Sequence, residues 1–317
     1  MKKRILSILL ALALLCAVLP AAAYRASAAT TSGSCGDNLN WTFENATGTL
    51  TITGRGKMDS GSPWESLKSS IKKVVIGNGV TNIGRSAFYE CSALTSVTIP
   101  DSVTSIDYCA FDCCYSLKSV TIPNSVTSIG IAGFDCCVSL TSLTIPNSVT
   151  SIGAWAFEGC ESLTSLTIPD SVTVIDNGTF HYCASLTSVT IPSGVTSIGE
   201  VAFDECYSLT SVVIPASVTS IGGGAFCSND DLVIYGVAGS TAETYANENN
   251  IPFIALNAPK ITTQPKSATV AVGKSATFTV AAAGGMLSYQ WQYKRSGATA
   301  WSNWSGKTDT ILNVGII

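Results

Sequence analysis

The chain has 317 residues, of which 46% are hydrophobic and only 12% are charged, and its formal net charge at pH 7 is −4. The charge is unevenly distributed, because residues 71–231 carry four basic and 14 acidic side chains, whereas residues 260–317 carry six basic and one acidic. This acidic central region argues against nucleic acid as a partner, since binding to duplex DNA or RNA depends on Lys and Arg that neutralise phosphates.

The N-terminus has the pattern of a secretory signal peptide over residues 1–29. Basic residues 2–4 precede an apolar run at 5–19, and small residues follow at 26–28. The apolar run is shorter than the about 20 residues that a membrane-spanning helix needs. We therefore expect cleavage near Ala28 or Ala29, a secreted or cell-surface location, and no membrane span after cleavage.

Residues 30–70 are predicted to form an N-terminal cap made of a hairpin and a short helix. Residues 40–43 and 49–52 alternate between polar and apolar side chains on either side of Asn-Ala-Thr-Gly at 45–48, which is the composition of a hairpin turn. A short helix is expected at about residues 64–69. Such a cap covers the edge of the first repeat, which would otherwise invite end-to-end aggregation.

Residues 71–231 repeat nearly the same sequence seven times with a period of 23 residues. The units begin at Ile71, Leu94, Leu117, Leu140, Leu163, Leu186 and Leu209, and no insertion breaks the register. A fixed period of this length indicates a solenoid, in which each unit packs only against its neighbours. With parallel strands about 4.8 Å apart, the stack should be on the order of 30 Å long.

The fourth unit, residues 140–162, shows what each position is expected to do. Leu140, Leu143 and Ile145 have the spacing of a short strand with its apolar side chains inward, and Pro146 ends the strand because it cannot donate to a sheet ladder. Further inward positions follow at Val149, Ile152, Ala156, Phe157 and Cys160. The last three have the spacing of a short helical turn. The predicted fold is a strand-dominated, mixed α/β solenoid of short parallel strands and short helical turns.

Six cysteines occupy the same position in successive units, and asparagine takes that position in the seventh. These residues are Cys91, Cys114, Cys137, Cys160, Cys183, Cys206 and Asn229. We interpret the column as buried, reduced thiols rather than zinc ligands, because parallel side chains do not converge on a tetrahedral ion. Cys113 and Cys136 match in neighbouring units and could form a disulfide if their Cα atoms lie within about 7 Å, so their state stays open.

The chain beyond the repeats divides into two predicted segments. Residues 232–256 should cap the stack with a strand at 232–235, a helix at 240–249 and a further strand at 251–256. Residues 257–317 alternate Thr, Ala and Val, and strands are expected there at 275–280 and 288–293.

The repeat pattern L-x-x-[LV]-x-I-P-x-x-V-x-x-I-[GD]-x-x-[AGT]-F-x-x-C, found in seven copies, resembles the BspA-like class of bacterial leucine-rich repeats. The resemblance covers about half of the chain. It implies an exported surface protein that is used for adhesion to proteins or host cells.

A second resemblance lies in residues 257–317, where Tyr289-Gln290-Trp291-Gln292 is similar to the central strand of a bacterial immunoglobulin-like domain. In that family the tryptophan packs between two sheets. Roughly 60 residues are present, against about 100 for a complete sandwich. We therefore expect an incomplete all-β immunoglobulin-like domain whose last strands are missing through truncation.

Sequence variation between the repeats is concentrated after the second inward-facing segment of each unit. The candidate surface residues are Tyr89, Glu90, Tyr108, Asp112, Tyr115, Asp135, Trp155, Glu158, His181, Tyr182, Asp204 and Tyr207. Aromatic side chains among carboxylates are typical of the anchors of a protein interface, although surface positions also vary where nothing constrains them. The strand side carries rows of Thr instead, which fit either a repetitive glycan or a well-solvated sheet.

The sequence offers little for catalysis, cofactors or metals. His181 is the only histidine, and its neighbour Cys183 belongs to the buried column, so no nucleophile is placed beside this base. Glycines 222–224 lack the lysine that follows in a phosphate-binding loop. The row Asp112, Asp135, Glu158 and Asp204 permits calcium, but no D-x-D-x-D-G loop is present. We expect a protein that is not an enzyme and that holds no cofactor or metal.

These observations favour an exported binding protein that acts in adhesion or protein–protein interaction through its solenoid. The expected partner is a protein or a glycan on a host or neighbouring cell surface. A carbohydrate-binding module for cell-wall or host glycans, with Trp155, Tyr182 and Tyr207 as stacking platforms, is the alternative.

Overall fold

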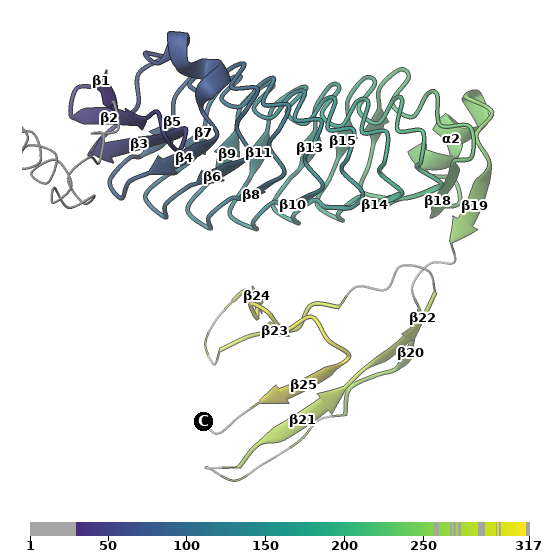
Figure 1. Cartoon of the computed structure of the whole chain (residues 1–317). Helices are drawn as coiled ribbons and strands as arrows, with labels where there is room; N and C mark the ends of the chain where they lie inside the picture. The colour runs from purple at the N-terminus through teal and green to yellow at the C-terminus, as the bar shows by residue number, and fades with distance from the viewer. Residues whose placement is uncertain are drawn as a thin grey trace, which may run out of the picture.

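The computed structural model describes residues 30–256 and, within 260–314, all residues except 267, 269, 270, 272, 273, 285–288, 296 and 298. The predicted signal peptide lies outside the described residues. Residues 71–231 form a stack of coils whose strands run side by side along the stack (Figure 1). This arrangement confirms the strand-dominated solenoid.

Each coil contributes two short strands to two separate sides of the stack. The first set is β4 (Lys73–Ile76), β6 (Ser96–Thr98), β8 (Ser119–Thr121), β10 (Ser142–Thr144), β12 (Leu166–Thr167), β14 (Ser188–Thr190) and β16 (Ser211–Ile214). The second set is β5 (Asn82–Ile83), β7 (Ser105–Ile106), β9 (Ser128–Ile129), β11 (Ser151–Ile152), β13 (Val174–Ile175), β15 (Ser197–Ile198) and β17 (Ser220–Ile221). Pairing is parallel with a shift of one repeat, so that Leu143 lies opposite Leu166 and Ile152 opposite Ile129.

A column of stacked phenylalanine rings runs through the core. It consists of Phe88, Phe111, Phe134, Phe157, Phe180, Phe203 and Phe226, with neighbouring ring centroids 5.1–5.6 Å apart. Trp64 stacks on Phe88 at one end, and Tyr245 meets Phe226 edge-on at the other. Aromatic side chains from both ends of the stack therefore close the column and exclude water from it.

The cysteine column is buried and reduced, and it forms hydrogen bonds between coils. The Sγ atoms of Cys114, Cys137, Cys160, Cys183 and Cys206 each donate to the carbonyl oxygen of the phenylalanine 26 residues earlier, at 3.3–3.4 Å. Asn229 donates to the Phe203 carbonyl in the same way at 2.9 Å. Asparagine can thus replace cysteine because both side chains donate to the equivalent phenylalanine carbonyl of the preceding coil. Cys113 and Cys136 are also free thiols, so no disulfide joins them.

The side of the stack after the second strand differs from the expected helical turn. Every coil has two residues with left-handed backbone there, four positions apart: Ser86 and Glu90, Cys109 and Cys113, Ala132 and Cys136, Trp155 and Gly159, Gly178 and Tyr182, Val201 and Glu205, and Gly224 and Ser228. Amide groups bond to the next coil instead of within a helix, as Phe88 does to Ala110 and Glu90 to Asp112, both at 2.9 Å. These bonds between coils offset the cost of left-handed backbone at residues other than glycine.

The N-terminal end begins with β1 (Thr30–Gly36), β2 (Leu39–Glu44) and β3 (Thr49–Gly54), which pair antiparallel. The predicted hairpin corresponds to β2 and β3, whereas β1 was not predicted. Strand β3 then pairs in parallel with β4, so the hairpin continues the sheet of the first coil. The expected short helix is a 3-10 helix, η1 (Glu65–Ser70).

The C-terminal end of the stack has β18 (Val233–Val237), α2 (Thr241–Glu248) and β19 (Phe253–Leu256). Both strands extend the sheet of β14 and β16 in parallel. Helix α2 buries Ala242, Tyr245 and Ala246 against the last coil. No helix among the described residues has the length and apolar character needed to cross a membrane.

The described residues of 260–314 form three two-stranded antiparallel pairs. They are β20 (Lys260–Thr263) with β22 (Ala281–Ala283), β21 (Ala276–Thr279) with β25 (Ile311–Val314), and β23 (Gln292–Tyr293) with β24 (Ser302–Asn303). Within this described part only Leu312 is buried. Trp291 is partly exposed and donates through Nε1 to the Asp309 carbonyl at 2.8 Å. An immunoglobulin-like sandwich is thus not confirmed, and this assignment stays a prediction, as do the five segment boundaries.

Candidate functional site

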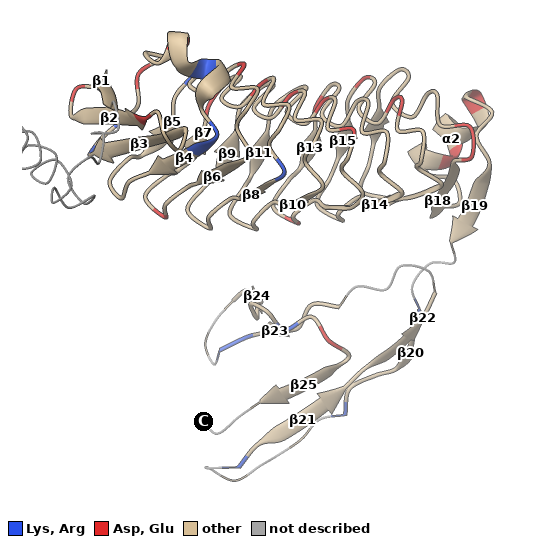
Figure 2. Cartoon of the chain, viewed as in Figure 1, with Lys and Arg blue, Asp and Glu red and all other residues tan. Residues whose placement is uncertain are grey.

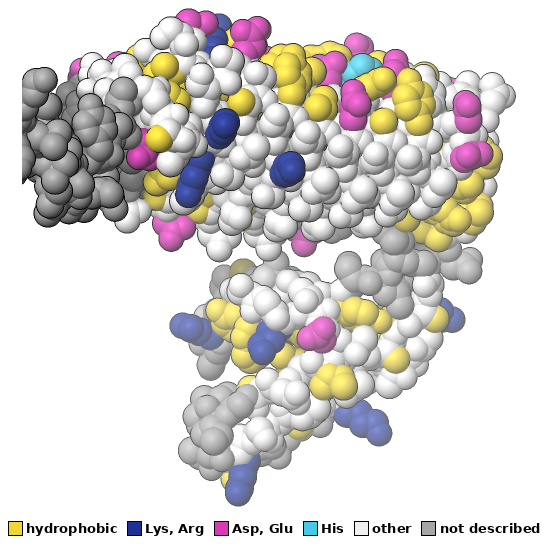
Figure 3. All heavy atoms as spheres, viewed as in Figure 1, with side chains coloured by type: hydrophobic (Ala, Val, Ile, Leu, Met, Phe, Trp, Pro, Cys, Tyr) yellow, Lys and Arg dark blue, Asp and Glu magenta, His cyan; other side chains and the backbone are white. Residues whose placement is uncertain are grey.

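The predicted surface residues lie on the side of the stack built by the left-handed turns, which we call the turn face. Six of them, Tyr89, Asp112, Asp135, Glu158, His181 and Asp204, occupy one position of successive coils, 23 residues apart. Because the coils stack in register, residues at this position become neighbours in space. Acidic and hydrophobic side chains accordingly alternate along this edge of the molecule (Figure 3).

Basic side chains are confined to the part of the chain up to Lys118 and to the segment from Lys260 onward. Residues 119–259 contain no Lys or Arg but 12 Asp and Glu residues. Figure 2 shows this asymmetry along the solenoid. Among the described residues, the carboxylates of the turn face after Glu90 form no ion pair with Lys or Arg, and the field over this surface favours cations.

In the first coils the tyrosines of the turn face contact the few basic side chains. Lys68 lies 5.0 Å from the ring centroid of Tyr89 and 3.9 Å from the carboxylate of Glu90. The guanidinium of Arg85 lies 4.6 Å from the ring centroid of Tyr108. These cation–π contacts hold Tyr89 and Tyr108 in place at the N-terminal end of the surface.

An open groove of about 440 Å³ lies across the turns of three successive coils. Its apolar lining comes from Tyr108, Ile131 and Trp155, and its acidic lining from Asp112, Asp135 and Glu158. Ile131 is 46% exposed, whereas the other isoleucines of residues 71–231 are buried or partly buried. Ile131 was not among the surface residues predicted from the sequence. Its position in the repeat nevertheless indicated exposure, because Arg85 and Tyr108 occupy it in the two preceding units. We call this feature the acidic groove.

Asp135 is the least solvated carboxylate of the acidic groove. Its Oδ1 atom is buried and has no hydrogen-bond partner among the described residues. The pKa of Asp135 is raised to about 6, chiefly by desolvation through burial and also by the neighbouring charges of Glu158 and Asp112, against hydrogen bonds from Cys136 that lower it. A cationic group in the groove would stabilise the ionised form of this carboxylate.

Next to the groove, His181 lies between two carboxylates. Its Nδ1 atom is 3.0 Å from Oε1 of Glu158, and its Nε2 atom is 3.9 Å from Oδ2 of Asp204. The edge of the His181 ring faces Trp155, with ring centroids 5.8 Å apart. The structure therefore brings four predicted residues from three coils into one contiguous cluster.

The remaining predicted aromatic residues surround this cluster or lie apart from it. Tyr182 packs edge-on against Tyr207, with ring centroids 5.9 Å apart, and the Tyr207 hydroxyl donates to Glu205 at 2.6 Å. Tyr115 is exposed beside Cys113 and does not line the acidic groove. Trp155 covers Gly178, where a Cβ atom would lie 1.9 Å from the indole Cε3. One face of the indole is thus already occupied.

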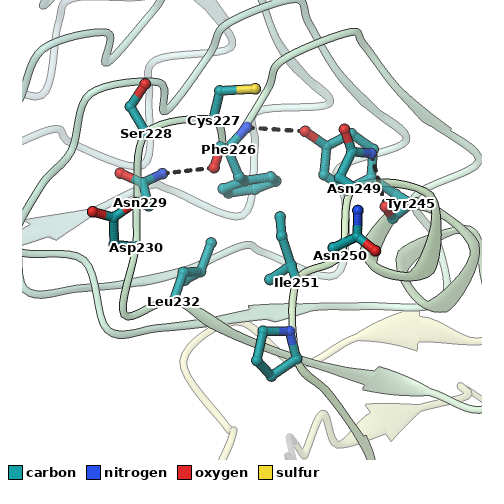
Figure 4. A pocket seen from close by; sticks show the side chains of 11 residues that line it. Phe226, Cys227, Ser228, Asn229, Asp230, Leu232, Tyr245, Asn249, Asn250 and Ile251 are labelled. Atoms are coloured by element: carbon teal, nitrogen blue, oxygen red, sulfur yellow. Dashed lines mark hydrogen bonds between the residues drawn. The ribbon is translucent and has the colours of Figure 1, made fainter.

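A second cavity, of about 270 Å³, lies between the last coil and α2 (Figure 4). Several of its polar groups are paired with one another: the Phe226 amide donates to the Tyr245 hydroxyl at 3.1 Å, and Asn249 donates to the Tyr245 carbonyl at 2.8 Å, whereas Oδ1 of Asn229 is buried without a hydrogen-bond partner among the described residues. The apolar lining includes Leu232 and Ile251, which extend the core. We interpret this cavity as a gap in the packing between the last coil and the C-terminal cap. The turn face therefore remains the candidate site.

Cys183, the thiol nearest to His181 in sequence, points away from the turn face. It is buried and donates to the Phe157 carbonyl at 3.3 Å. Burial and the charges of Cys160 and Cys206 raise the pKa of its thiol well above the ordinary value. This cysteine is therefore a core residue and not a nucleophile for His181.

The stacked coils and their recurring sequence define a leucine-rich-repeat solenoid protein. The family model described as "BspA type Leucine rich repeat region (6 copies)" matches residues 66–184 and 109–233. This match spans more than half of the chain, and the protein belongs to that family.

Several solved structures are similar to this chain. A leucine-rich repeat protein from Bacteroides ovatus is 25% identical over 63% of this chain and 70% of its own, with a TM-score of 0.45. The leucine rich repeat protein of T. pallidum is 27% identical over 56% of this chain and 91% of its own, with a TM-score of 0.43. A protein from Faecalibacterium prausnitzii, described as a leucine rich cell surface protein, is 23% identical over 68% of this chain and 97% of its own, with a TM-score of 0.33. Comparison with curated proteins gave no match.

Proposed function

We propose that this chain is an exported bacterial surface protein that binds a protein partner through its turn face. The family consists of bacterial surface proteins with repeats suited to protein interaction, which supports binding rather than catalysis. The acidic groove carries the proposal, because it combines exposed apolar side chains with carboxylates that form no ion pair with Lys or Arg among the described residues. We infer that adhesion to a host or neighbouring cell is the use of this binding.

The chemistry of the groove favours a partner segment that presents a basic residue beside an apolar one. A Lys or Arg side chain would pair with the partly exposed carboxylate of Asp135, and the partly exposed Trp155 would contact its aliphatic stem. An apolar side chain next to it would cover Ile131. Such central contacts, enclosed by a polar rim, give the largest share of binding energy in protein interfaces.

A carbohydrate ligand has weaker support on this surface. Stacking on a sugar needs an open aromatic face, and one face of Trp155 lies on Gly178. On the strand side, the hydroxyls of Thr95, Thr141 and Thr187 donate to carbonyls of the preceding coil and are partly used within the protein.

Two binding experiments on the full chain test this proposal. In the first, the chain is immobilised and titrated with purified host extracellular-matrix proteins; in the second, it is applied to a glycan array. We expect a matrix protein to bind, with an affinity that falls at least about tenfold in Trp155→Ala and Asp135→Asn, because each removes a central contact. Thr144→Ala, on the exposed strand side, is the matched control and should bind as the unmodified chain does.

Added salt should weaken the interaction, since the groove contributes charge. The proposal fails if protein binding is unchanged in both groove variants, or if only glycans bind and Trp155→Ala abolishes that binding. Loss of binding in Thr144→Ala but not in Trp155→Ala would show that the binding site lies on the strand side of the stack.

A further inference from the structure

Three potential metal ligands meet in the C-terminal part of the turn face. They are His181, Asp204 and Glu205, and one ligand atom of each lies within 4.8 Å of the other two. Ligands of a tetrahedral zinc ion lie about 3.4 Å apart, so modest rotations of these partly exposed side chains would complete such a geometry. We propose that His181, Asp204 and Glu205 bind a transition-metal dication of the zinc type.

The hydrogen bond from His181 to Glu158 orients the imidazole for metal binding. An ionised carboxylate can only accept, so the 3.0 Å contact with Glu158 places the proton on Nδ1. With its Nδ1 atom directed at Glu158, the ring turns Nε2 toward Oδ2 of Asp204 at 3.9 Å, where a metal cation would bridge the two atoms. A histidine that donates its other nitrogen to a carboxylate is the usual arrangement at zinc.

Both carboxylates are also held by outer hydrogen bonds that leave one oxygen free. Oδ1 of Asp204 accepts from the Glu205 amide at 2.9 Å, which leaves Oδ2 for an ion. Oε2 of Glu205 accepts from the Tyr207 hydroxyl at 2.6 Å, which leaves Oε1. These hydrogen bonds restrict each of the three ligands to a narrow range of orientations before any ion binds, and this lowers the entropy lost on binding.

The surrounding charge supplies an independent reason for a cation. Glu158, Asp204 and Glu205 are neighbours, and residues 119–259 contain no Lys or Arg that could pair with them. Figure 3 shows the single histidine among acidic side chains on this edge. A dication would offset the mutual repulsion of these carboxylates more fully than a single imidazole between them.

The ligand set distinguishes between classes of metal. One imidazole and two carboxylates suit Zn²⁺ and other divalent transition metals, whereas Ca²⁺ takes six to eight oxygen ligands. Three protein ligands leave a coordination position open for water. This site goes beyond the proposed interaction with a partner, because the chain alone supplies the ligands.

Calorimetric titration of the full chain with ZnCl₂ tests the site. Accessible thiols are first blocked with N-ethylmaleimide under native conditions, since Cys113, Cys136 and Cys227 would otherwise bind zinc. We expect one ion per chain, and a dissociation constant raised about tenfold or more in His181→Gln, Asp204→Asn and Glu205→Gln. Asp170→Asn removes an exposed carboxylate elsewhere and should bind as the unmodified chain does.

Two further measurements keep the test decisive. Co²⁺ bound to the thiol-blocked chain without any substitution should give visible absorption bands of a low-coordinate site with nitrogen ligation, a result that does not depend on any variant folding. An excess of Ca²⁺ should not displace zinc. The proposal is overturned if zinc no longer binds after thiol blocking, if His181→Gln binds it unchanged, or if Ca²⁺ competes at equal concentration.

Discussion

The column of phenylalanine rings allows a quantitative test at its centre, Phe157. This ring is fully buried and lies 5.5 Å from Phe134 and 5.6 Å from Phe180, nearly parallel to both. Leucine retains most of the apolar surface, so Phe157→Leu chiefly removes two stacked pairs. At about 0.5–1.5 kcal/mol for each pair, the free energy of unfolding should fall by about 1–3 kcal/mol. Phe157→Ala also leaves a cavity and should cost about 3–5 kcal/mol.

Urea denaturation followed by circular dichroism measures these losses. The matched control is Thr144→Ala, whose side chain is exposed on β10 and should change the free energy of unfolding by no more than about 0.5 kcal/mol. Because each coil packs only on its neighbours, a defect at the centre weakens two interfaces together and should also reduce the cooperativity of unfolding. A loss for Phe157→Leu no larger than that of the control would refute the argument that ring stacking couples the coils.

Three other predictions concern the turn face and the thiols. Gly178 has φ of +58° and is covered by Trp155, so Gly178→Ala should cost about 1–2 kcal/mol for the left-handed backbone alone and shift the tryptophan emission as the indole is displaced; unchanged emission would argue against this contact. In the folded protein, maleimide should modify the partly exposed Cys113 and Cys136 well before the buried cysteine column, and equal rates would mean that the column is not in the core. The pKa of Asp135, raised from 3.8 to about 6, means that the folded state binds this proton more tightly than the unfolded state, so its contribution to stability is present below pH 4 and is lost as the pH rises through 6. Asp135→Asn should therefore raise Tm at pH 7 and flatten the dependence of Tm on pH between 4 and 7, and an unchanged pH profile in thermal unfolding would contradict the assigned burial.

The predicted effects of Asp135→Asn on stability and on partner binding have opposite signs. The Asp135 carboxylate destabilises the free protein because its Oδ1 atom is buried without a partner. The same carboxylate should strengthen a complex in which a basic side chain pairs with it. A residue that lowers stability while serving recognition is typical of a functional surface.

The period of 23 residues was sufficient to predict the solenoid and the columns of its core. Identical positions of successive repeats must meet the same environment, so Phe157 and Cys160 could be placed inside without knowledge of the coil geometry. The replacement of cysteine by Asn229 was also visible in the sequence, and the structure supplies the reason, a shared carbonyl acceptor one coil away.

Local pattern was a poorer guide where backbone geometry depends on a neighbouring coil. The strands of the second set contain only two residues each, too few for an alternating pattern, and they form because the next coil offers a partner. The spacing of Ala156, Phe157 and Cys160 fits a helical turn equally well. Hydrogen bonds to the next coil stabilise left-handed backbone at two positions of each turn. The sequence of a single repeat cannot predict these bonds, because the partner atoms belong to another repeat.

The turn face shows the same division between sequence and tertiary structure. Variation among the repeats was enough to select its aromatic and acidic residues, because their positions in the period are fixed. Stacking alone determined that Ile131 would join Tyr108 and Trp155 in one groove, and that Glu158 would orient His181 toward Asp204. Residues 23 positions apart in the chain become neighbours only when the coils pack, and chemistry between them depends on distances that the order of residues does not contain.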